Sequence, residues 1–383
     1  MRFIPYGHHT IGRDDIRAVV DVLNSDWITQ GSKIGEFEDA VCKYTGAKYA
    51  VAVNSGTAAL HAASFAAGIK CKDEVITSPV TFLATANCIV YQKAKPVFAD
   101  INANSLNINP EEIERKITRR TKAIIAVHFA GFPCNMDKIL SIAKKNRLIV
   151  IEDASHALGA QYKGRKIGSI GNMTTFSFHP LKSITTGEGG MILTNNKKLY
   201  TRLLCFRNHG IVKNKKKLRK IGPWYYEMQN LGYNYRITDF QCALGINQLA
   251  KLDKFIRRRE EIAIRYNELF KDIDNFIEFP QEVPNYIKHA WHLYIIQLRL
   301  DRLKISRKKF FNILRNKNIG VQVHYIPIHL QPFYKRNFGY KKGDFPQAER
   351  FYERAITLPI FPALANKDID RIAKTVKSLV KNR

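Results

Sequence analysis

Between residues 50 and 152, short runs of β-branched and other apolar residues alternate with stretches of helical character. We expect strands at 50–54, 74–78, 96–101, 123–129 and 148–152, and helices at 57–68, 81–91, 110–117 and 136–145. The strand candidates lack alternation of polar and apolar residues, which is typical of strands covered on both faces. This order predicts an α/β fold with a mainly parallel central sheet covered by helices.

The pattern changes after about residue 249. Before that point, further strands are expected at 174–178 and 191–194. After it, we expect a long charged helix at 251–270, strands at 291–298 and 320–325, and helices at 306–316 and 367–380. We therefore expect a large α/β domain over residues 1–249 and a smaller C-terminal α+β domain over residues 250–383. A chain of 383 residues is long enough to bury two such cores.

The composition excludes several classes of protein. Hydrophobic residues make up 45% of the chain, which argues against disorder. The 6 cysteines are scattered without a CxxC pair, so neither a disulfide scaffold nor a metal site is expected. No apolar run approaches the roughly 20 residues that span a bilayer, and the N-terminus lacks the apolar core of a signal peptide. We expect a cytoplasmic protein with no membrane partner.

The charge of +29 raises an alternative from another class, a DNA-binding regulator. The basic residues are spread along the chain, and the densest run is at residues 213–220. No helix-turn-helix, RNA-binding or zinc-finger signature accompanies them. We interpret the charge as a solvated surface, or as a positive field that attracts a diphosphate-bearing substrate, and expect no nucleic-acid partner.

Ser55, Gly56 and Thr57 stand where the first expected strand meets its helix. The free N–H groups and dipole of a helix N-terminus favour an anion at such a place. Gly56 would let the backbone approach a phosphate closely. An ordinary helix cap by Ser55 or Thr57 explains the same residues, so this segment alone does not indicate a site.

A second segment, 152–157, follows the strand expected at 148–152. Asp153 lies at the carboxyl end of that strand, where open α/β sheets bind ligands. A carboxylate there would face a cation or a protonated ring nitrogen, although a helix-capping role remains open. His156 would face the same site, but a lone histidine is more often a structural hydrogen-bond partner.

A third segment contains Lys182, which follows the apolar residues 174–180 and precedes a glycine-rich turn at 187–190. Most lysines are solvated surface groups. A lysine that faces a cleft after a buried strand has its ammonium form disfavoured and can act as a nucleophilic amine. Ser177, on the same segment, is placed to bind the same anion as Thr57.

Together these residue types fit one cofactor, pyridoxal 5′-phosphate. It requires a lysine that binds it covalently, a carboxylate against its pyridine nitrogen and a phosphate cup. An aromatic ring that stacks on the pyridine would complete the set. Phe82 is the candidate for that ring, and a core phenylalanine is the alternative reading of this residue.

These segments, followed by a fourth at 232–236, resemble the DegT-type nucleotide-sugar aminotransferases, which are fold-type I pyridoxal phosphate enzymes. The resemblance covers about residues 4–364. It implies the two-domain architecture described above. It also implies a homodimer whose active sites are shared between subunits.

The resemblance implies a role for each matching residue. Lys182 corresponds to the lysine that binds the cofactor and moves a proton, Asp153 to the partner of the pyridine nitrogen, and His156 to the residue beside the ring hydroxyl. The remaining cofactor contacts are implied for Gly56, Thr57 and Ser177 at the phosphate, Phe82 on the ring, and Asn234 from the second subunit. Contacts with the nucleotide sugar are implied for Tyr6, Thr29, Gln322, His324, Tyr325 and Tyr334.

The amino-acid sequences of several segments are similar to those of one branch of the family. The product of that branch is UDP-4-amino-4,6-dideoxy-N-acetyl-β-L-altrosamine, for pseudaminic acid synthesis. These segments are Tyr6 and residues 25–31, 128–133, 153–156 and 322–327. The branch implies amino transfer from L-glutamate to C4 of a UDP-linked 4-keto-6-deoxy sugar. Because no motif determines sugar stereochemistry, keto sugars of the bacillosamine or perosamine routes remain alternatives. Lys182 argues against the dehydratases of the family, which have histidine at that position.

Overall fold

A computed structural model of the chain describes residues 2–280 and 283–381. Residue 1 of the first expected domain, and residues 281–282 and 382–383 of the second, lie outside the described residues. A seven-stranded sheet runs through the first part in the order β1-β9-β8-β5-β4-β2-β3. Its strands are β1 (Tyr49–Val53), β2 (Glu74–Thr77), β3 (Lys95–Phe98), β4 (Thr121–Val127), β5 (Ile149–Asp153), β8 (Met173–Ser177) and β9 (Gly190–Thr194). Neighbours pair in parallel except around β9, which is antiparallel to both β1 and β8.

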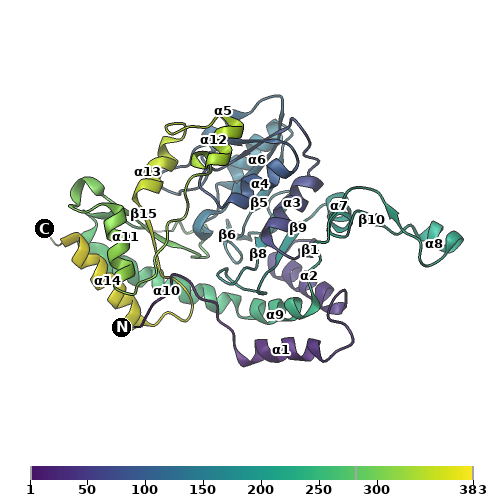
Figure 1. Ribbon diagram of the computed structural model, residues 1–383, viewed down its shortest axis with the longest axis horizontal. Helices are drawn as coiled ribbons and strands as arrows, with labels where there is room; N and C mark the ends of the chain where they lie inside the picture. The colour runs from purple at the N-terminus through teal and green to yellow at the C-terminus, as the bar shows by residue number, and fades with distance from the viewer. Residues whose placement is uncertain (1, 281–282, 382–383) are drawn as a thin grey trace.

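Both faces of this sheet are buried, as the lack of alternation predicts. Along β1, Ala50 and Ala52 join one apolar core, whereas Val51 and Val53 join another on the opposite face. The first core includes residues of α2 (Ser32–Thr45), α5 (Pro110–Lys116), α6 (Met136–Lys145) and α9 (Asp239–Ala250). The second includes residues of α3 (Gly56–Ala66), α4 (Leu83–Tyr91) and α7 (Lys197–Arg207). This three-layer arrangement confirms the predicted α/β fold (Figure 1).

The first core continues through Leu252 and Ile256 into α10 (Leu252–Phe270), which leads to the C-terminal part. There, a three-stranded antiparallel sheet is formed by β12 (Ile277–Glu278), β14 (Tyr294–Leu298) and β15 (Ala355–Leu358). The helices of this part are α11 (Arg307–Asn316), α12 (Pro332–Phe338), α13 (Pro346–Arg354) and α14 (Asn366–Lys381). The domain boundary expected after residue 249 stays a prediction.

The strand expected at residues 320–325 is wrong. Within this segment Gln322 makes an isolated bridge to Thr357, and Ile319, just before it, makes one to Ile4. The position beside β14 is taken by β15, whose four residues are all buried. The segment after Gln322 turns away from the sheet, and the side chains of His324 and Tyr325 line the cavity described below. Helix α4 also begins later than expected, because Phe82 has an extended backbone and caps it.

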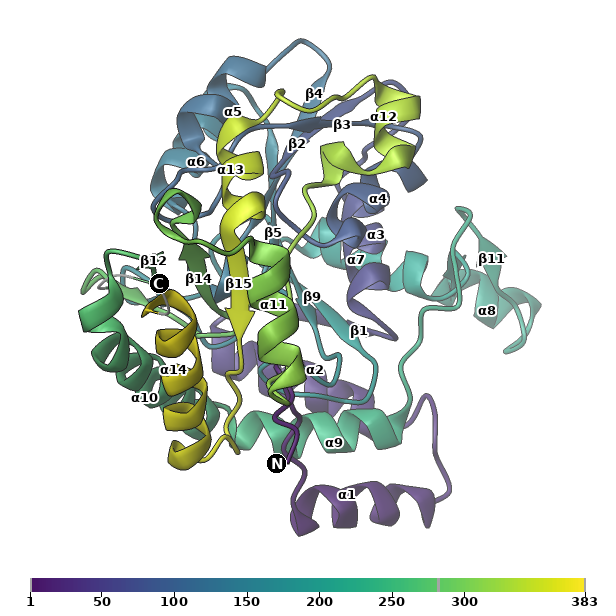
Figure 2. The ribbon, with the colours of Figure 1, turned by 60° about the vertical axis from the view of Figure 1, so that its left-hand side comes forward.

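Two features lie outside this layered body. Helix α1 (Arg13–Leu23) lies against the outer side of α9 in both views (Figure 1 and Figure 2). Residues 211–228 form an arm that extends away from the rest of the molecule. The arm contains β10 (Ile211–Val212), α8 (Lys215–Ile221) and β11 (Glu227–Met228), so the basic run at 213–220 lies largely on α8. The remaining short strands are β6 (Gln161–Tyr162), β7 (Arg165–Lys166) and β13 (Ile287–Lys288).

In the part of the chain that the structure describes, no helix has the length and apolar character needed to cross a membrane.

Candidate active site

A cavity of about 390 Å³ opens at the carboxyl edge of the large sheet. Val127, Asp153 and Ser177 reach it from the ends of β4, β5 and β8, as expected for an open α/β sheet. The C-terminal part closes it from the other side. Eleven residues that the sequence singled out line this cavity: Tyr6, Ser55, Gly56, Thr57, Phe82, Asp153, His156, Ser177, Lys182, His324 and Tyr325.

The start of α3 forms one wall of this cavity. Ser55 caps the helix by accepting a hydrogen bond from the Ala58 N–H at 3.0 Å. Gly56 lies so close to the end of β8 that an added Cβ would stand 2.7 Å from Cβ of Ser177. Thr57 lines the same wall in the first turn of the helix. The two segments therefore form a narrow cradle of backbone and hydroxyl groups at a helix N-terminus, which suits a phosphate.

Asp153, at the end of β5, is 5% exposed and points into the cavity. Its Oδ2 accepts a hydrogen bond from Thr85 Oγ1 at 2.7 Å. Its Oδ1 accepts from the Ser155 hydroxyl at 2.6 Å and from the Ser155 N–H at 3.1 Å. The carboxylate is therefore held in place by uncharged donors and keeps its negative charge available to a ligand.

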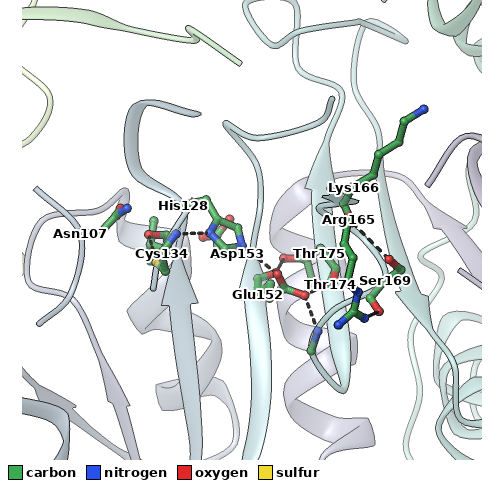
Figure 3. Close-up of polar contacts among 12 residues, drawn as sticks. Asn107, His128, Cys134, Glu152, Asp153, Arg165, Lys166, Ser169, Thr174 and Thr175 are labelled. Carbon is green, nitrogen blue, oxygen red and sulfur yellow. Dashed lines mark hydrogen bonds and ion pairs between the residues drawn. The ribbon is translucent and has the colours of Figure 1, made fainter. Parts of the chain in front are cut away.

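The neighbouring residue on β5, Glu152, is fully buried beside His128 and Thr174 (Figure 3). Its carboxylate accepts hydrogen bonds from Thr174 Oγ1 at 2.8 Å and from the Gly171 N–H at 2.7 Å, and it lies 2.9 Å from His128 Nε2. The backbone N–H of His128 donates to the Asp153 carbonyl at 3.1 Å. This buried network ties β4 and β8 to β5 directly beside Asp153.

Lys182 lines the same cavity as Asp153. Burial lowers the pKa of Lys182 to about 8, against a smaller opposing effect of the Asp153 charge. Its amine is therefore partly neutral near neutral pH, and a neutral amine is a nucleophile and a base. This is the behaviour that the sequence predicted for Lys182.

His156 is buried beside Tyr325 and His292. Its Nε2 lies 3.1 Å from the Tyr325 hydroxyl, and its ring centroid lies 4.2 Å from that of His292. Burial, and then the charge of Lys182, hold the pKa of His156 well below its usual range, so the ring is neutral. Within the described residues its Nδ1 is buried without a hydrogen-bond partner.

Three expected aromatic residues stand around the opening. Phe82 is 57% exposed where it lines the cavity, with its ring centroid 6.0 Å from that of Tyr325. The ring of Tyr6 lies 5.6 Å from His324, whose Nδ1 is 2.9 Å from Thr357 Oγ1. An exposed phenylalanine inside a cavity differs from a core residue, because it leaves one ring face free for a ligand.

Four expected residues do not line this cavity within one chain. Thr29 is exposed and bridges Thr238, and Gln322 is exposed and pairs with Thr357. Tyr334 is buried and donates a hydrogen bond to Asn87 at 2.6 Å. Asn234 is exposed, pairs with Asn208 and stands outside the cavity. The roles expected for these four residues stay predictions.

Residues 9–377 match the family described as the DegT/DnrJ/EryC1/StrS aminotransferase family. The chain belongs to this family. Its Lys182 and Asp153 thus meet in one cavity on the fold of a fold-type I aminotransferase, as the sequence predicted. The enzyme class is that of nucleotide-sugar aminotransferases, which sets aside the DNA-binding regulator suggested by the charge.

Curated relatives cover nearly the whole aminotransferase chain. An uncharacterized protein of Methanocaldococcus jannaschii is 52% identical over 99% of this chain and 98% of its own. The spore coat polysaccharide biosynthesis protein SpsC of Bacillus subtilis is 44% identical, covering 99% and 97%. The UDP-4-amino-4,6-dideoxy-N-acetyl-β-L-altrosamine transaminase of Campylobacter jejuni is 41% identical, covering 98% and 97%.

Two solved structures support the same assignment. PseC of Helicobacter pylori, an aminotransferase of pseudaminic acid biosynthesis, matches with a TM-score of 0.92 at 33% identity over 100% of both chains. The sugar aminotransferase Spr1654 of Streptococcus pneumoniae, in its PMP form, matches with a TM-score of 0.92 at 31% identity over 99% of both chains. Spr1654 is also known in a PLP form, and pyridoxal 5′-phosphate is the cofactor of the family.

The residues of this aminotransferase fit that cofactor. The Asp153 carboxylate offers a counter-charge for a protonated ring nitrogen, and the buried Nδ1 of His156 lacks a partner. The Gly56–Ser177 cradle has no room for a Cβ. No group of three or more histidine, cysteine or acidic residues among the described residues is arranged to hold a metal ion.

The sequence did not single out Thr85, Ser155 or His292, although all three line the cavity of the aminotransferase. Ser155 lies between Asp153 and His156 in the sequence, and its position between two expected site residues could have indicated it. Thr85 is three residues after Phe82, close to one helical turn away. His292 precedes β14 and carries no local sequence signal.

Proposed function

We propose that the enzyme transfers an amino group from L-glutamate to C4 of a UDP-linked 4-keto-6-deoxy-N-acetylhexosamine. The product would be UDP-4-amino-4,6-dideoxy-N-acetyl-β-L-altrosamine, for pseudaminic acid synthesis. The observation that carries the aminotransferase chemistry is the cavity shared by Lys182, Asp153 and His156. The choice of sugar is supported by the 41% identity to the Campylobacter jejuni transaminase and by the PseC structure.

When bound, pyridoxal phosphate supplies an electron-withdrawing ring and the carbon that carries the amino group between the two substrates. Lys182 is the group that would take a proton from the substrate carbon and deliver it to the cofactor carbon that carries the amino group. Its pKa of about 8 keeps a useful fraction of neutral amine near neutral pH, because burial disfavours the ammonium form. Removing the amine removes both the covalent attachment point and the proton carrier.

Asp153 and His156 orient the ring and stabilise its charge. The Asp153 carboxylate, held by Thr85 and Ser155, would pair with the protonated ring nitrogen and keep that proton in place. His156 is neutral, because burial opposes its charged form. It therefore contacts the ring hydroxyl as a hydrogen-bond partner and not as a cation.

The phosphate is held by Gly56, Thr57 and Ser177. The first turn of α3 presents backbone N–H groups and the positive end of the helix dipole. The hydroxyls of Thr57 and Ser177 line the same wall of the cavity. Phe82 would stack on the ring of the cofactor with the face that it exposes to the cavity.

The active unit is a homodimer. An isolated two-stranded ribbon is marginally stable in water, and the arm exposes Ile221, Trp224, Tyr226 and Met228. Helix α1 exposes Ile16, Val20 and Leu23 on the body. These apolar surfaces suit a second copy of the chain. Asn234, close beyond the arm, would then reach the phosphate of the partner's cofactor.

The nucleotide sugar is expected to lie at the mouth of the cavity. Tyr6, His324 and Tyr325 already stand there, whereas Thr29, Gln322 and Tyr334 lie outside the cavity of one chain. A second copy of the chain, or closure of the mouth over the substrate, is needed before the last three can contact it.

The function is tested by mass spectrometry of products formed from L-glutamate and defined keto sugars. We expect amination of the UDP-linked 4-keto sugar with L-arabino configuration and none from its D-configured isomer or from GDP-linked 4-keto-6-deoxymannose. Lys182→Ala is expected to form no product, and Lys198→Ala, on an exposed face of α7, to retain wild-type turnover. Amination of the D-configured or GDP-linked sugar instead would contradict the proposed substrate while leaving the aminotransferase assignment in place.

A further inference from the structure

The hydrogen bonds around Asp153 extend beyond its immediate neighbours. Thr85 Oγ1 donates to Asp153 Oδ2 at 2.7 Å, and Thr81 Oγ1 lies 2.7 Å from Thr85 Oγ1. Thr85 is 0% exposed and Thr81 is 3% exposed. Across residues 2–280 and 283–381, only Thr85 and Ser155 form hydrogen bonds with the carboxylate of Asp153.

The direction of this chain of hydroxyl groups follows from the number of protons. A threonine hydroxyl has one proton to donate. An ionised Asp153 accepts only, so the proton of Thr85 is committed to the carboxylate. The oxygen of Thr85 must then accept from Thr81, which fixes the order Thr81 to Thr85 to Asp153. Hydrogen bonds in such a chain polarise and strengthen one another.

The start of α4 brings these two hydroxyls together. Thr81 comes just before Phe82, the residue that caps α4, and Thr85 lies in the first turn of the helix. Phe82 caps α4, and the Thr85 N–H donates to its carbonyl at 3.2 Å. The turn that presents Phe82 to the cavity therefore also carries the two threonines. One short segment links the placement of the stacking ring to the orientation of the Asp153 carboxylate.

This arrangement matters for the chemistry because the hydrogen bond between a carboxylate and a ring N–H depends on direction. Ser155 and Thr85 engage different oxygens of Asp153, so they restrain rotation of the carboxyl group. Hydroxyl donors do so without introducing a cation that would compete with the ring nitrogen for the negative charge. Loss of the Thr85 hydroxyl would leave Oδ2 free to rotate out of line.

We propose that Thr81 and Thr85 are positioning residues that orient the Asp153 carboxylate toward the pyridine nitrogen of the cofactor. Thr85 acts directly on Asp153, and Thr81 acts through Thr85. The proposal rests on pyridoxal phosphate as the cofactor and not on the identity of the sugar, so it can fail or succeed independently of the proposed substrate.

The test compares four single variants: Thr85→Val, Thr85→Ser, Thr81→Val and Thr77→Val. Valine has nearly the shape of threonine but no hydroxyl, and serine keeps the hydroxyl. Thr77 is the matched control, because it is a 0% exposed threonine whose hydroxyl donates to the Ile125 carbonyl, and it is not among the described residues that hydrogen-bond the Asp153 carboxylate. The first readout is the dissociation constant of pyridoxal phosphate for each apoprotein, measured by fluorescence quenching.

We expect Thr85→Val to weaken cofactor binding about 10- to 100-fold, as for the loss of a hydrogen bond to a charged group. Thr81→Val should weaken it about 2- to 10-fold, as for a bond between neutral groups. Thr85→Ser should restore most of the affinity, and Thr77→Val should bind as the wild type does. With the half-reaction of L-glutamate as second readout, Thr85→Val should lower kcat and leave KM within about twofold.

The proposal is overturned if Thr85→Val binds the cofactor and turns over glutamate as the wild type does. It is equally overturned if Thr77→Val loses as much affinity as Thr85→Val, since the effect would then be general to buried threonines. If Thr85→Val does not fold, Thr81→Val is compared with Thr77→Val instead. Equal cofactor affinities for these two variants would contradict the proposed hydrogen-bond chain from Thr81 through Thr85 to Asp153.

Discussion

The hydroxyl of Tyr325 lies 3.1 Å from Nε2 of His156, although the two residues are 169 positions apart in the chain. Tyr325 comes from the C-terminal part and His156 from the edge of the large sheet. Burial, followed by the Asp153 charge, raises the pKa of the Tyr325 hydroxyl, so it remains protonated. When Tyr325 donates this proton to Nε2, the neutral imidazole carries its own proton on Nδ1, the buried atom without a partner among the described residues.

This contact predicts the effect of Tyr325→Phe. The variant should bind pyridoxal phosphate about 2- to 10-fold more weakly, because His156 loses the hydrogen bond that orients it. The dissociation constant of the apoprotein measures this. Tyr340→Phe is the control, since it removes a hydroxyl bonded to the Pro96 carbonyl in another part of the molecule. Equal affinities for the wild type and Tyr325→Phe would exclude an orienting role for Tyr325.

The lowered pKa of Lys182 predicts how cofactor attachment depends on pH. The neutral amine is the reactive form, so the rate at which the apoprotein binds pyridoxal phosphate covalently should rise with pH and level off above about 8. Asp153→Asn should move the midpoint to lower pH, because the Asp153 charge raises the pKa of Lys182. Stopped-flow absorbance follows the reaction. A midpoint near the ordinary lysine value would show that Lys182 is not desolvated.

The cradle at Gly56 predicts a strong effect of one methyl group. In Gly56→Ala the new Cβ would stand 2.7 Å from Cβ of Ser177, so the two segments must move apart. We expect a loss of about 1–3 kcal/mol in unfolding free energy, together with weaker binding of the cofactor phosphate. Gly35→Ala is the matched control. Gly35 lies inside α2, where an added Cβ would meet no atom of another segment within 4 Å, so alanine there should stabilise the protein slightly.

Denaturant titration measures the unfolding free energy of Gly56→Ala and Gly35→Ala, and a binding titration measures their affinity for the cofactor. If Gly56→Ala bound the cofactor with wild-type affinity, the phosphate would have to lie elsewhere in the cavity.

The arm predicts a dimer that surface substitutions disrupt. Trp224 and Met228 are 73% and 66% exposed in the single chain. Replacing both with serine should shift the protein toward a monomer in sedimentation equilibrium and lower turnover, since Asn234 could no longer reach the second site. Tyr286→Ser, at a 53% exposed residue outside the arm, should remain dimeric. A fully active monomer would contradict the shared active site.

The sequence predicted most of the large sheet because its strands are short runs rich in β-branched and apolar residues that lack alternation. Asp153 and Lys182 were placed correctly in one cavity, since both follow strands whose carboxyl ends meet at the same edge. The error at residues 320–325 has a different origin. An apolar run in the C-terminal part does not reveal its pairing partner, and the buried β15 took the place beside β14.

The supporting contacts were beyond sequence reasoning because they join distant positions. Thr85 and Asp153 are 68 positions apart, and no periodicity or motif connects them. His292 reaches His156 from the C-terminal part through the packing of two separate cores. The extension of the arm away from the body is likewise a property of tertiary structure, since its basic residues are compatible with any solvated segment.

The central claim is tested most directly by the visible absorption of the pyridoxal phosphate-loaded protein before and after addition of UDP-4-amino-4,6-dideoxy-N-acetyl-β-L-altrosamine. We predict that the yellow absorption disappears with this sugar, because reverse amino transfer consumes the coloured form, and that it persists with the D-configured isomer. A yellow protein that responds to the D-configured isomer but not to the altrosamine sugar would contradict the proposed substrate. A protein that does not turn yellow at all would contradict the role of Lys182.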